Sequence, residues 1–480
     1  MKLTVLVPCL LSLVSRHLPA QNAYLGNAAT ASDTLPDTLN VWVYFKDKNF
    51  LINPYLDLKD VVSPRSIERR LKVRPESLVI DYTDLPVTES YVQGAQPHVL
   101  QLHHCSRWLN GISVTVLKKS IREIEALPFV KGVDLSSRYG RTNGISGKLV
   151  SWKPNRSADS LDYGYSFAQL NLINIPAVHQ TGNYGQGVLI GVFDSGFDLA
   201  HESLRHLDVV ATRDFVENKD SVLPAGGTGE HGTKVLSTLA GYKPGILIGP
   251  AFRASFVLAR TEISSMEIPS EMDAWIAALE WADSIGVDIV TSSLSYGVFS
   301  YPYRSYQSHD MNGDTAFITR VADLAVSKGI IILNSAGNAG FVVDSSINTL
   351  TVPADGDSVL AIGAVDLNGD RAYFSSFGPT TDNPPRIKPD LMAPGLGVIA
   401  ASPVGPSGPR CRDCYFRVNG TSFSAPFVAG VVALILHDHP RATPMGIIEA
   451  LKMTASRGQS PDKFYGWGIV NAEAAIRYLR

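Results

Sequence analysis

Two residues are candidates for general base catalysis, one as the base and one as the group that orients it. Asp194 ends the apolar run GVLIGVF and is followed by Ser195 and Gly196. A carboxylate there can orient an imidazole, although a lone aspartate after a strand also forms turns or caps helices. His231 lies in GEHGTKVLSTLAG, between a glycine-rich loop and a run typical of a helix. A neutral imidazole is a natural general base for a hydroxyl; its alternative role is that of a polar loop residue.

Two further residues supply a hydroxyl and an amide. Ser422 lies in NGTSFSAPFVAGVVALILH, where the apolar run predicts a buried helix with the serine at its N-terminus. A serine there also serves as an N-cap. Asn338, in LNSAGNAG, follows a predicted strand and can donate its amide to a developing oxyanion, or simply occupy a left-handed turn. Each structural alternative is reasonable on its own. The chain would lack this acid, base, nucleophile and amide donor only if all four alternatives applied at once.

The sequence from residue 163 onward predicts the elements that would position these groups. Strands are expected at residues 187–193, 255–260, 287–294, 329–334 and 359–365, and helices at EMDAWIAALEWADS, capped by Ser270, and at TAFITRVADLAVSKG. Continuous apolar strands alternating with helices are typical of an α/β fold with a mostly parallel sheet flanked by helices on both faces. Ligands of such folds bind at the carboxyl ends of the strands, where Asp194 and Asn338 are expected.

Residues 1–20 have the pattern of a signal peptide. They contain one positive charge, the apolar stretch Leu3–Val14 and a small residue at Ala20. This stretch is shorter than the roughly 20 residues that span a bilayer. We therefore expect a secreted protein, extracellular or periplasmic, with no membrane contact after the signal is removed.

Residues 21–135 predict a small α+β domain. Strands are expected in NVWVYFKD, HVLQLHHCS and ISVTVL, with a turn at Asn110–Gly111, and a helix in KKSIREIEAL. Residues 136–162 are polar and without periodicity, which is typical of an exposed linker that a protease can cut. The apolar strands then occupy a domain at residues 163–480.

Charge and cysteine content argue against a nucleic acid as partner and against a zinc site. The 480 residues hold 42 Lys+Arg and 45 Asp+Glu, a net charge of −3, so no basic field favours a nucleic acid. Without Cys9 of the signal peptide three cysteines remain, and without the region of Cys105 the number becomes even. Cys411 and Cys414 are then candidates for a disulfide. No second pair or flanking histidine completes a zinc site, so no metal is predicted.

The segments DSG, HGT, SAGN and GTSFSAP resemble the signature blocks of the subtilisin-like serine proteases (subtilases, peptidase family S8). The chain order Asp, His, Ser is the order known for subtilisin. The similarity extends from Tyr165 to Asn471 and includes FSSFGP at 374–379, KPDLMAPG at 388–395 and YGWGIVNA at 465–472.

This resemblance implies a secreted serine endopeptidase with a subtilisin-like fold. The resemblance implies that Asp194 orients His231 and that His231 deprotonates Ser422. It also implies that Asn338 and the Ser422 N–H bind the oxyanion that forms before the acyl-enzyme. The N-terminal domain resembles the family's propeptide, which implies an intramolecular inhibitor, and the substrates implied are proteins or peptides. No cofactor is required; structural calcium is frequent in the family, but no loop here identifies its ligands.

The sequence departs from the family pattern in three places. Ser293 and Leu294 match the Ser-Leu of a substrate-lining strand, which predicts substrate binding, but Ser295 replaces the usual glycine. A side chain at this position is expected either to narrow the primary pocket or to crowd the peptide backbone. Lys234 stands where many relatives have a second histidine. The insertion SPVGPSGPRCRDCYFRV precedes the serine block and is expected to rim the cleft.

Other functions fit the sequence less well. HESLRH resembles a zinc motif, but His201 and His206 would point roughly 140° apart on a helix. The glycine-rich segment at 182–187 precedes its strand instead of following it, so it does not form a dinucleotide site. The chain has no GxSxG elbow of an α/β-hydrolase. The remaining alternative is an inactive subtilase-like binding or structural protein.

Overall fold

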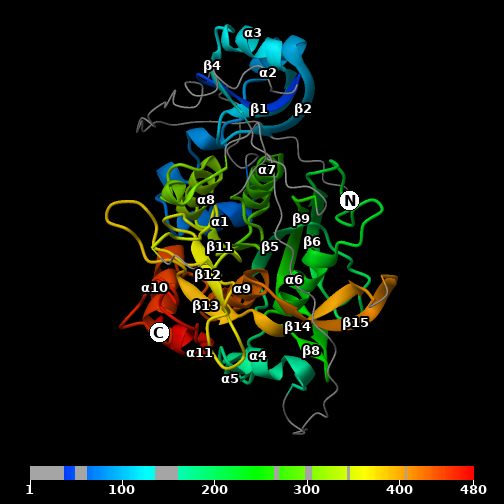
Figure 1. The fold of residues 1–480 in the computed structure, drawn as a ribbon, viewed down its shortest axis with the longest axis vertical. Coiled ribbons are helices and arrows are strands. Elements are labelled where there is room, and N and C mark those ends of the chain that lie inside the picture. The colour runs from blue at the N-terminus through cyan, green and yellow to red at the C-terminus, as the bar shows by residue number, and fades with distance from the viewer. Residues whose placement is uncertain are drawn as a thin grey trace. The chain divides into compact units, whose positions relative to one another are not determined.

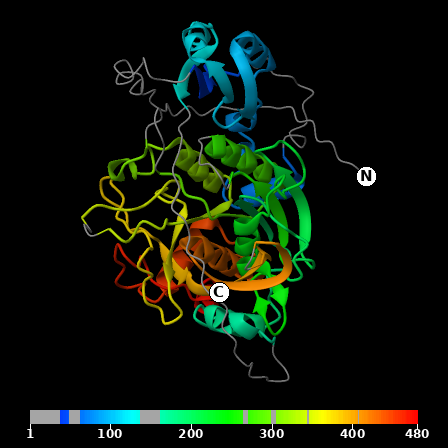
Figure 2. The ribbon, with the colours of Figure 1, turned by 45° about the vertical axis from the view of Figure 1, so that its right-hand side comes forward.

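The computed structural model describes residues 37–48, 62–135, 161–263, 270–297, 305–342, 346–405 and 408–480. The expected signal peptide at 1–20, Cys9 and nearly all of the expected linker at 136–162 lie outside the described residues. The chain, whose course can be followed by colour in Figures 1 and 2, divides into two compact units. The first unit combines the N-terminal region with residues 270–286, and the second holds most of the chain from residue 161 onward.

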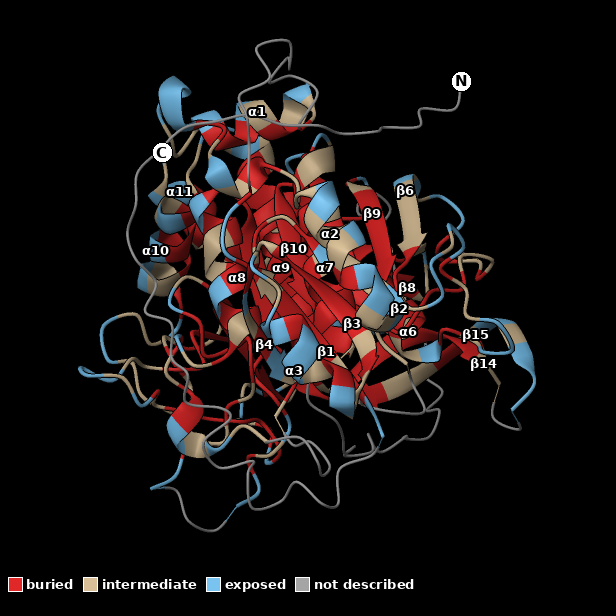
Figure 3. Cartoon of the chain, turned by 90° about the horizontal axis from the view of Figure 1, so that it is seen from above, coloured by how far each residue is buried: buried red, intermediate tan, exposed pale blue. Residues whose placement is uncertain are grey.

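A seven-stranded parallel sheet forms the core of the second unit. Its strand order is β13-β12-β11-β10-β5-β9-β6, with every neighbouring pair parallel. The strands are β5 (Leu189–Asp194), β6 (Asp208–Asp214), β9 (Ser255–Arg260), β10 (Ile289–Ser292), β11 (Ile331–Ser335), β12 (Leu360–Val365) and β13 (Leu391–Pro394). Every residue of β5 and of β10 to β13 is buried, as expected for strands covered on both faces. Figure 3 draws β9 and β10 almost wholly as buried.

Helices and two hairpins accompany this sheet. The helices are α4 (Phe167–Asn171), α5 (Ile175–His179), α6 (Glu230–Ala240), α8 (Phe317–Ser327), α9 (Thr421–Asp438), α10 (Pro444–Thr454) and α11 (Ala472–Tyr478), with 3-10 turns at Gly164–Ser166 and Ser308–Asp310. The hairpins pair β7 (Tyr242–Lys243) with β8 (Leu247–Ile248) and β14 (Leu396–Val404) with β15 (Arg410–Asn419). Helices α6 and α9 pack against each other, and α8 packs against β11. The predicted α/β fold with a parallel sheet flanked by helices is confirmed.

Helix α9 is apolar on every side because it lies inside the second unit. It packs against β10 to β13 and against α6. Among the described residues it is the one helix long and apolar enough to cross a membrane by length and composition, but 89% of that window is buried. An all-round apolar helix in that position belongs to a protein core.

The first unit is built on a four-stranded antiparallel sheet in the order β2-β3-β1-β4. Its strands are β1 (Thr38–Phe45), β2 (Val99–Ser106), β3 (Gly111–Leu117) and β4 (Val130–Leu135), and its helices are α1 (Pro64–Leu71), α2 (Glu89–Ala95), α3 (Ile121–Glu125) and α7 (Ser270–Ile285). Short 3-10 turns lie at Glu76–Leu78, Tyr82–Asp84, Gln96–His98 and Lys118–Ser120. Asn110, with φ of 52°, makes the predicted turn before Gly111. The predicted small α+β region is therefore present.

Three of the four buried carboxylates of helix α7 lie on one face, within the first unit. Asp273, Glu280 and Asp283 recur at helical spacing, so they lie on one face. Their exposed fractions are 0%, 8% and 0%. Asp273 accepts hydrogen bonds from the Trp42 indole of β1 and the Ser113 hydroxyl of β3. The sheet of the first unit thus supplies donors to a helix that lies far away in the sequence.

Arginines of the N-terminal region neutralise the second half of this face. Asp283 pairs with Arg69, with Arg70 at 2.6 Å and with Arg107 at 3.0 Å. Arg70 is itself shared with Asp84, its two guanidinium nitrogens each 2.8 Å from one carboxylate oxygen. Because isolated buried charges are very costly, such a cluster holds together only while its charges balance.

Glu280 completes the same face. It accepts hydrogen bonds from the Ser106 hydroxyl and from the backbone N–H groups of Arg107, at 3.0 Å, and Trp108, at 3.2 Å. Burial raises the pKa of this carboxyl group, although the charge of Arg107 and these hydrogen bonds oppose the rise. The contacts tie α7 to the end of β2.

Replacing Asp283 tests how far this cluster stabilises the first unit. Asp283→Asn leaves Arg69 and Arg70 buried without their shared countercharge, so the free energy of unfolding should fall by about 3–5 kcal/mol. The measurement is urea denaturation of the full-length chain, followed by tryptophan fluorescence, with chain integrity checked by mass spectrometry. Glu125→Gln, which removes an exposed carboxylate of α3, is the matched control and should change the free energy by less than about 0.5 kcal/mol. Equal effects of the two substitutions would contradict the assignment.

Candidate functional site

The carboxyl end of β5 holds a fully buried aspartate. Asp194 has an exposed fraction of 0%. Its Oδ1 atom accepts the backbone N–H of Ser195 at 2.7 Å and the Nδ1–H of His231 at 2.8 Å. Its Oδ2 atom is buried and has no hydrogen-bond partner among the described residues. A strand end of a parallel sheet thus presents an ionisable group to an imidazole, as the sequence predicts for ligand sites of such folds.

His231 is the second residue of α6 and lies over this carboxylate. Because a carboxylate only accepts hydrogen bonds, Nδ1 must carry the proton, which leaves Nε2 as a proton acceptor. Burial lowers the pKa of the imidazole, but the charge and the hydrogen bond of Asp194 outweigh it, so the pKa lies above 6.5. The following Gly232 has no room for a side chain: an added Cβ would lie 2.3 Å from the Gly196 carbonyl oxygen.

Ser422 is the second residue of α9, directly after Gly420 and Thr421. Its hydroxyl donates to the carbonyl of Ser293 at 3.2 Å, and the Ser293 hydroxyl donates to the carbonyl of Ser422 at 2.7 Å. Ser422 and His231 both lie in the described part of the chain, and no hydrogen bond joins Ser422 Oγ to the imidazole there. The ring of Phe423, the next residue, lies 5.9 Å from the imidazole, centroid to centroid. A turn of the serine hydroxyl away from Ser293 is needed before it can donate to His231.

Asn338 is exposed in the loop that follows β11, and its amide orientation is set by α9. Its Oδ1 atom accepts the backbone N–H of Thr421 at 2.9 Å and the hydroxyl of Thr421 at 3.0 Å. The Nδ2 group donates to no described residue and is therefore free for a ligand. The first N–H groups of a helix also lack partners within that helix, so the start of α9 and Asn338 together offer donors for a negative oxygen.

Leu294 and Ser295 follow Ser293 after the end of β10. Leu294 is buried, and its carbonyl accepts a hydrogen bond from Asn334 at 2.9 Å. Ser295 is half-buried. A role of Ser293, Leu294 and Ser295 in binding substrate stays a prediction. Sequence reasoning did not foresee that Ser293 contacts Ser422, or that Thr421 orients Asn338; for Thr421, its place beside Ser422 in GTS was the available signal.

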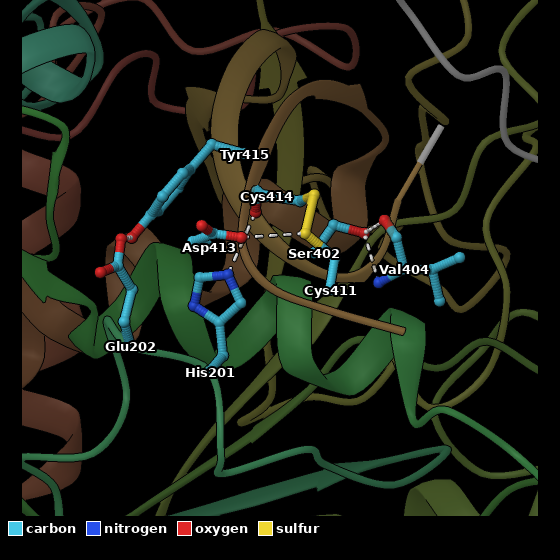
Figure 4. Close-up of a disulfide and its surroundings, with 8 residues drawn as sticks. All are labelled: His201, Glu202, Ser402, Val404, Cys411, Asp413, Cys414 and Tyr415. Atoms are coloured by element: carbon cyan, nitrogen blue, oxygen red, sulfur yellow. Dashed lines mark hydrogen bonds between the residues drawn. A yellow bond between two sulfur atoms is a disulfide. The ribbon is translucent and has the colours of Figure 1, made fainter. Parts of the chain in front are cut away.

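Cys411 and Cys414 form a disulfide in β15 (Figure 4). Cys105 is a free cysteine. Cys411, Asp413 and Cys414 are the one group of metal-ligating residue types that gathers in the described part of the chain. Because the two sulfur atoms are bonded to each other, they are not thiolates and do not form a zinc site. The predicted insertion therefore lies in the β14–β15 hairpin, most of which the structure describes.

The strand with the disulfide holds the segment that follows Asp194. The carbonyl of Cys414 accepts from His201 Nε2 at 3.1 Å, and the carbonyl of Arg412 accepts the Glu202 N–H at 2.8 Å (Figure 4 shows the His201 contact). The His206 ring instead forms a hydrogen bond with the carbonyl of Phe252. Residues 201–206 form turns and not a helix, so the two histidines of HESLRH do not meet at one metal position. Burial lowers the pKa of both.

Lys234, another of the three departures from the family pattern, lies on α6 and its charge acts on the imidazole. Its Nζ atom pairs with Glu230, one turn earlier on the same helix. The lysine therefore has a local partner, and its charge slightly opposes protonation of His231. Its effect is on packing and charge near the site.

Two family models match the chain. The model of the subtilase family matches residues 185–468, and the model of the peptidase S8 propeptide domain of Bacteroidota matches residues 40–148. Subtilisin NAT of Bacillus subtilis subsp. natto is 31% identical over 374 residues, which cover 77% of this chain and 82% of the relative. Subtilisin of Bacillus pumilus is 33% identical over 321 residues, covering 67% of this chain and 100% of the relative.

A solved structure supports the fold. The crystal structure of fervidolysin from Fervidobacterium pennivorans, a keratinolytic enzyme related to subtilisin, matches with a TM-score of 0.60 and 21% identity. The match covers 92% of this chain but only 61% of fervidolysin. At that identity the similarity speaks for the fold alone.

Titration of His231 tests the role of its carboxylate partner. In the intact chain the pKa of His231 should lie above the ordinary value of a histidine, and Asp194→Asn should lower this pKa, because burial is then opposed only by the more weakly acting charge of Glu262. A raised pKa in the folded state means that protonation stabilises the fold at acid pH, and that this contribution is lost as pH rises through the folded pKa. Imidazole proton shifts in NMR spectra measure both values, with the other histidines as internal controls. An unchanged His231 titration in Asp194→Asn would refute the assignment.

Proposed function

Since the chain belongs to the subtilase family and is a serine-type endopeptidase, we propose that Asp194, His231 and Ser422 are its catalytic triad. The observation that carries the proposal is the 2.8 Å hydrogen bond from His231 Nδ1 to Asp194, which leaves Nε2 as the base. Ser422 is the second residue of α9, and the ring of the next residue, Phe423, lies beside the imidazole of His231. The family's order of the three residues supports the same assignment.

In this proposal the reaction passes through an acyl-enzyme. The Ser422 hydroxyl turns from the Ser293 carbonyl, gives its proton to His231 Nε2 and attacks the carbonyl carbon of the peptide. The imidazolium is stabilised by Asp194 and protonates the leaving amine as the C–N bond breaks. A water molecule, deprotonated by the same imidazole, then hydrolyses the ester on Ser422.

We assign the oxyanion hole to Asn338 and the Ser422 backbone N–H. The supporting observation is that both hydrogen bonds of Thr421 engage Asn338 Oδ1, so the amide group is directed away from Thr421 with Nδ2 free. Donors fixed before the reaction stabilise the charge that develops in the transition state at no reorganisation cost. Ser293, Leu294 and Ser295 remain our proposed substrate-binding residues, with Ser295 narrowing the pocket.

The chain has a propeptide domain at its N-terminal side. We propose that it occupies residues 21–135 and inhibits the enzyme within the same molecule until the linker at 136–162 is cut, which releases a peptidase domain at 163–480. Residues 1–20 are proposed to direct export to the extracellular space or the periplasm. Protein or peptide substrates follow from the family. No organic cofactor takes part, and no residue set is proposed for calcium.

Reaction with a fluorophosphonate probe tests the triad. The processed protein should be labelled on Ser422, whereas Ser422→Ala and His231→Ala should lose labelling and lower turnover of a peptide p-nitroanilide by roughly a millionfold, the size known for the subtilisin triad itself. Ser424→Ala is the matched control, because Ser424 lies on the same helix and its hydroxyl donates to the Pro394 carbonyl at 3.1 Å. A folded, processed chain that neither reacts with the probe nor cleaves peptides would support the inactive binding protein instead.

A second experiment tests self-processing. Ser422→Ala should accumulate as a precursor that retains the N-terminal domain, because cutting of the linker would require the same nucleophile. Intact mass measurement and N-terminal sequencing of the secreted product give the extent and position of cleavage. Normal maturation of Ser422→Ala would assign the cut to another protease.

A further inference from the structure

The loop that carries Asn338 is bound by the segment FSSFGP. The backbone N–H of Ser376 donates to the carbonyl of Gly337 at 2.9 Å, and the hydroxyl of Ser376 accepts the backbone N–H of Ala339 at 3.1 Å. One residue therefore binds the chain immediately before and immediately after Asn338. The Gly340 N–H adds a third contact, to the carbonyl of Phe374 at 2.8 Å.

Ser376 makes a close contact with this loop and is itself buried. Ser376 has an exposed fraction of 0%. Gly337 has φ of +107°, and an added Cβ there would lie 2.8 Å from the Ser376 hydroxyl. Without that hydroxyl the Ala339 N–H would lose its acceptor in a half-buried place, which is costly enough to let the loop shift.

Asn338 needs such support because its own side chain is exposed. Thr421 fixes one end of its amide, but the position of Cα depends on the two peptide groups that Ser376 binds. An oxyanion donor acts only if it is held within about 0.5 Å of its working position. A misplacement of about 1 Å can cost on the order of a hundredfold in rate.

We propose that Ser376 is a positioning residue for the oxyanion amide of Asn338. The inference rests on the proposed function, in which Asn338 donates to the transition state. Ser376 does not touch the substrate. It acts by holding the carbonyl of Gly337 and the N–H of Ala339, so that Nδ2 of Asn338 stays where negative charge develops.

The chain offers a matched control next to this residue. Ser375 is also 0% exposed, and its hydroxyl also accepts a backbone N–H, that of Ala364 on β12, at 2.9 Å. Ser375→Ala and Ser376→Ala thus remove the same group, with the same burial and the same type of hydrogen bond. Of these two hydrogen bonds, only that of Ser376 is made to the loop that carries Asn338.

Steady-state kinetics of the mature enzyme on a peptide p-nitroanilide test the proposal. Ser376→Ala should lower kcat about tenfold and leave KM within about twofold, because the lost interaction acts in the transition state. Ser375→Ala should keep kcat within about twofold of the unsubstituted enzyme. In an Asn338→Ala background, Ser376→Ala should cause no further loss of kcat, because the amide that it positions is absent.

Three outcomes would overturn the proposal. They are a folded Ser376→Ala enzyme with unchanged kcat, an equal loss of kcat in Ser375→Ala, and a full tenfold loss on top of Asn338→Ala. If Ser376→Ala does not fold, as judged by circular dichroism, Ser376→Cys replaces it: its sulfur is a weaker acceptor, so kcat should fall severalfold at constant KM, and an unchanged kcat overturns the proposal. Failure of the proposed function is distinguished by the unsubstituted enzyme, which would then not react with fluorophosphonate.

Discussion

The hydrogen bond between Asp194 and His231 is the interaction on which the rest of the site depends. It requires an ionised carboxylate that is wholly buried, which is costly unless hydrogen bonds compensate for the lost water. The end of β5 provides part of this compensation through the Ser195 N–H. The other oxygen has no hydrogen-bond partner among the described residues. The charge of Asp194 and its hydrogen bond raise the pKa of His231, and the position of the carboxylate follows from the parallel sheet that ends there.

Much of the sheet could be predicted from the sequence because its inner strands are apolar on both faces. The runs at 187–193, 255–260, 287–294, 329–334 and 359–365 correspond to β5, β9, β10, β11 and β12. The edge strands β6 and β13 were missed. Strand β6 exposes residues such as Val210 at 54%, which interrupts the apolar pattern, and β13 has four residues and ends in Pro394. A short or half-covered strand has too weak a pattern to distinguish it from a loop.

The candidate site was predictable only where residue type and local position carried the signal. Asp194, His231, Ser422 and Asn338 stand at the ends of predicted elements, so their chemistry could be read along the chain. The contact of Ser376 with the Asn338 loop joins positions 37 residues apart, and the pairing of Arg69 with Asp283 joins positions 214 apart. Such pairs depend on the three-dimensional fold, and a buried arginine or aspartate looks in sequence like any surface charge.

Helix α7 connects β9 and β10 along the chain, yet the groups that satisfy its carboxylates come from the N-terminal region. A chain cut in the linker and separated from that region would keep Asp273, Glu280 and Asp283 and lose the donors that the N-terminal region supplies. Water would then have to hydrate a helix face that had been assembled dry, leaving it anionic. In such a molecule the helix between β9 and β10 would have to find other donors, or water, for a face whose donors come from the N-terminal region in the intact chain.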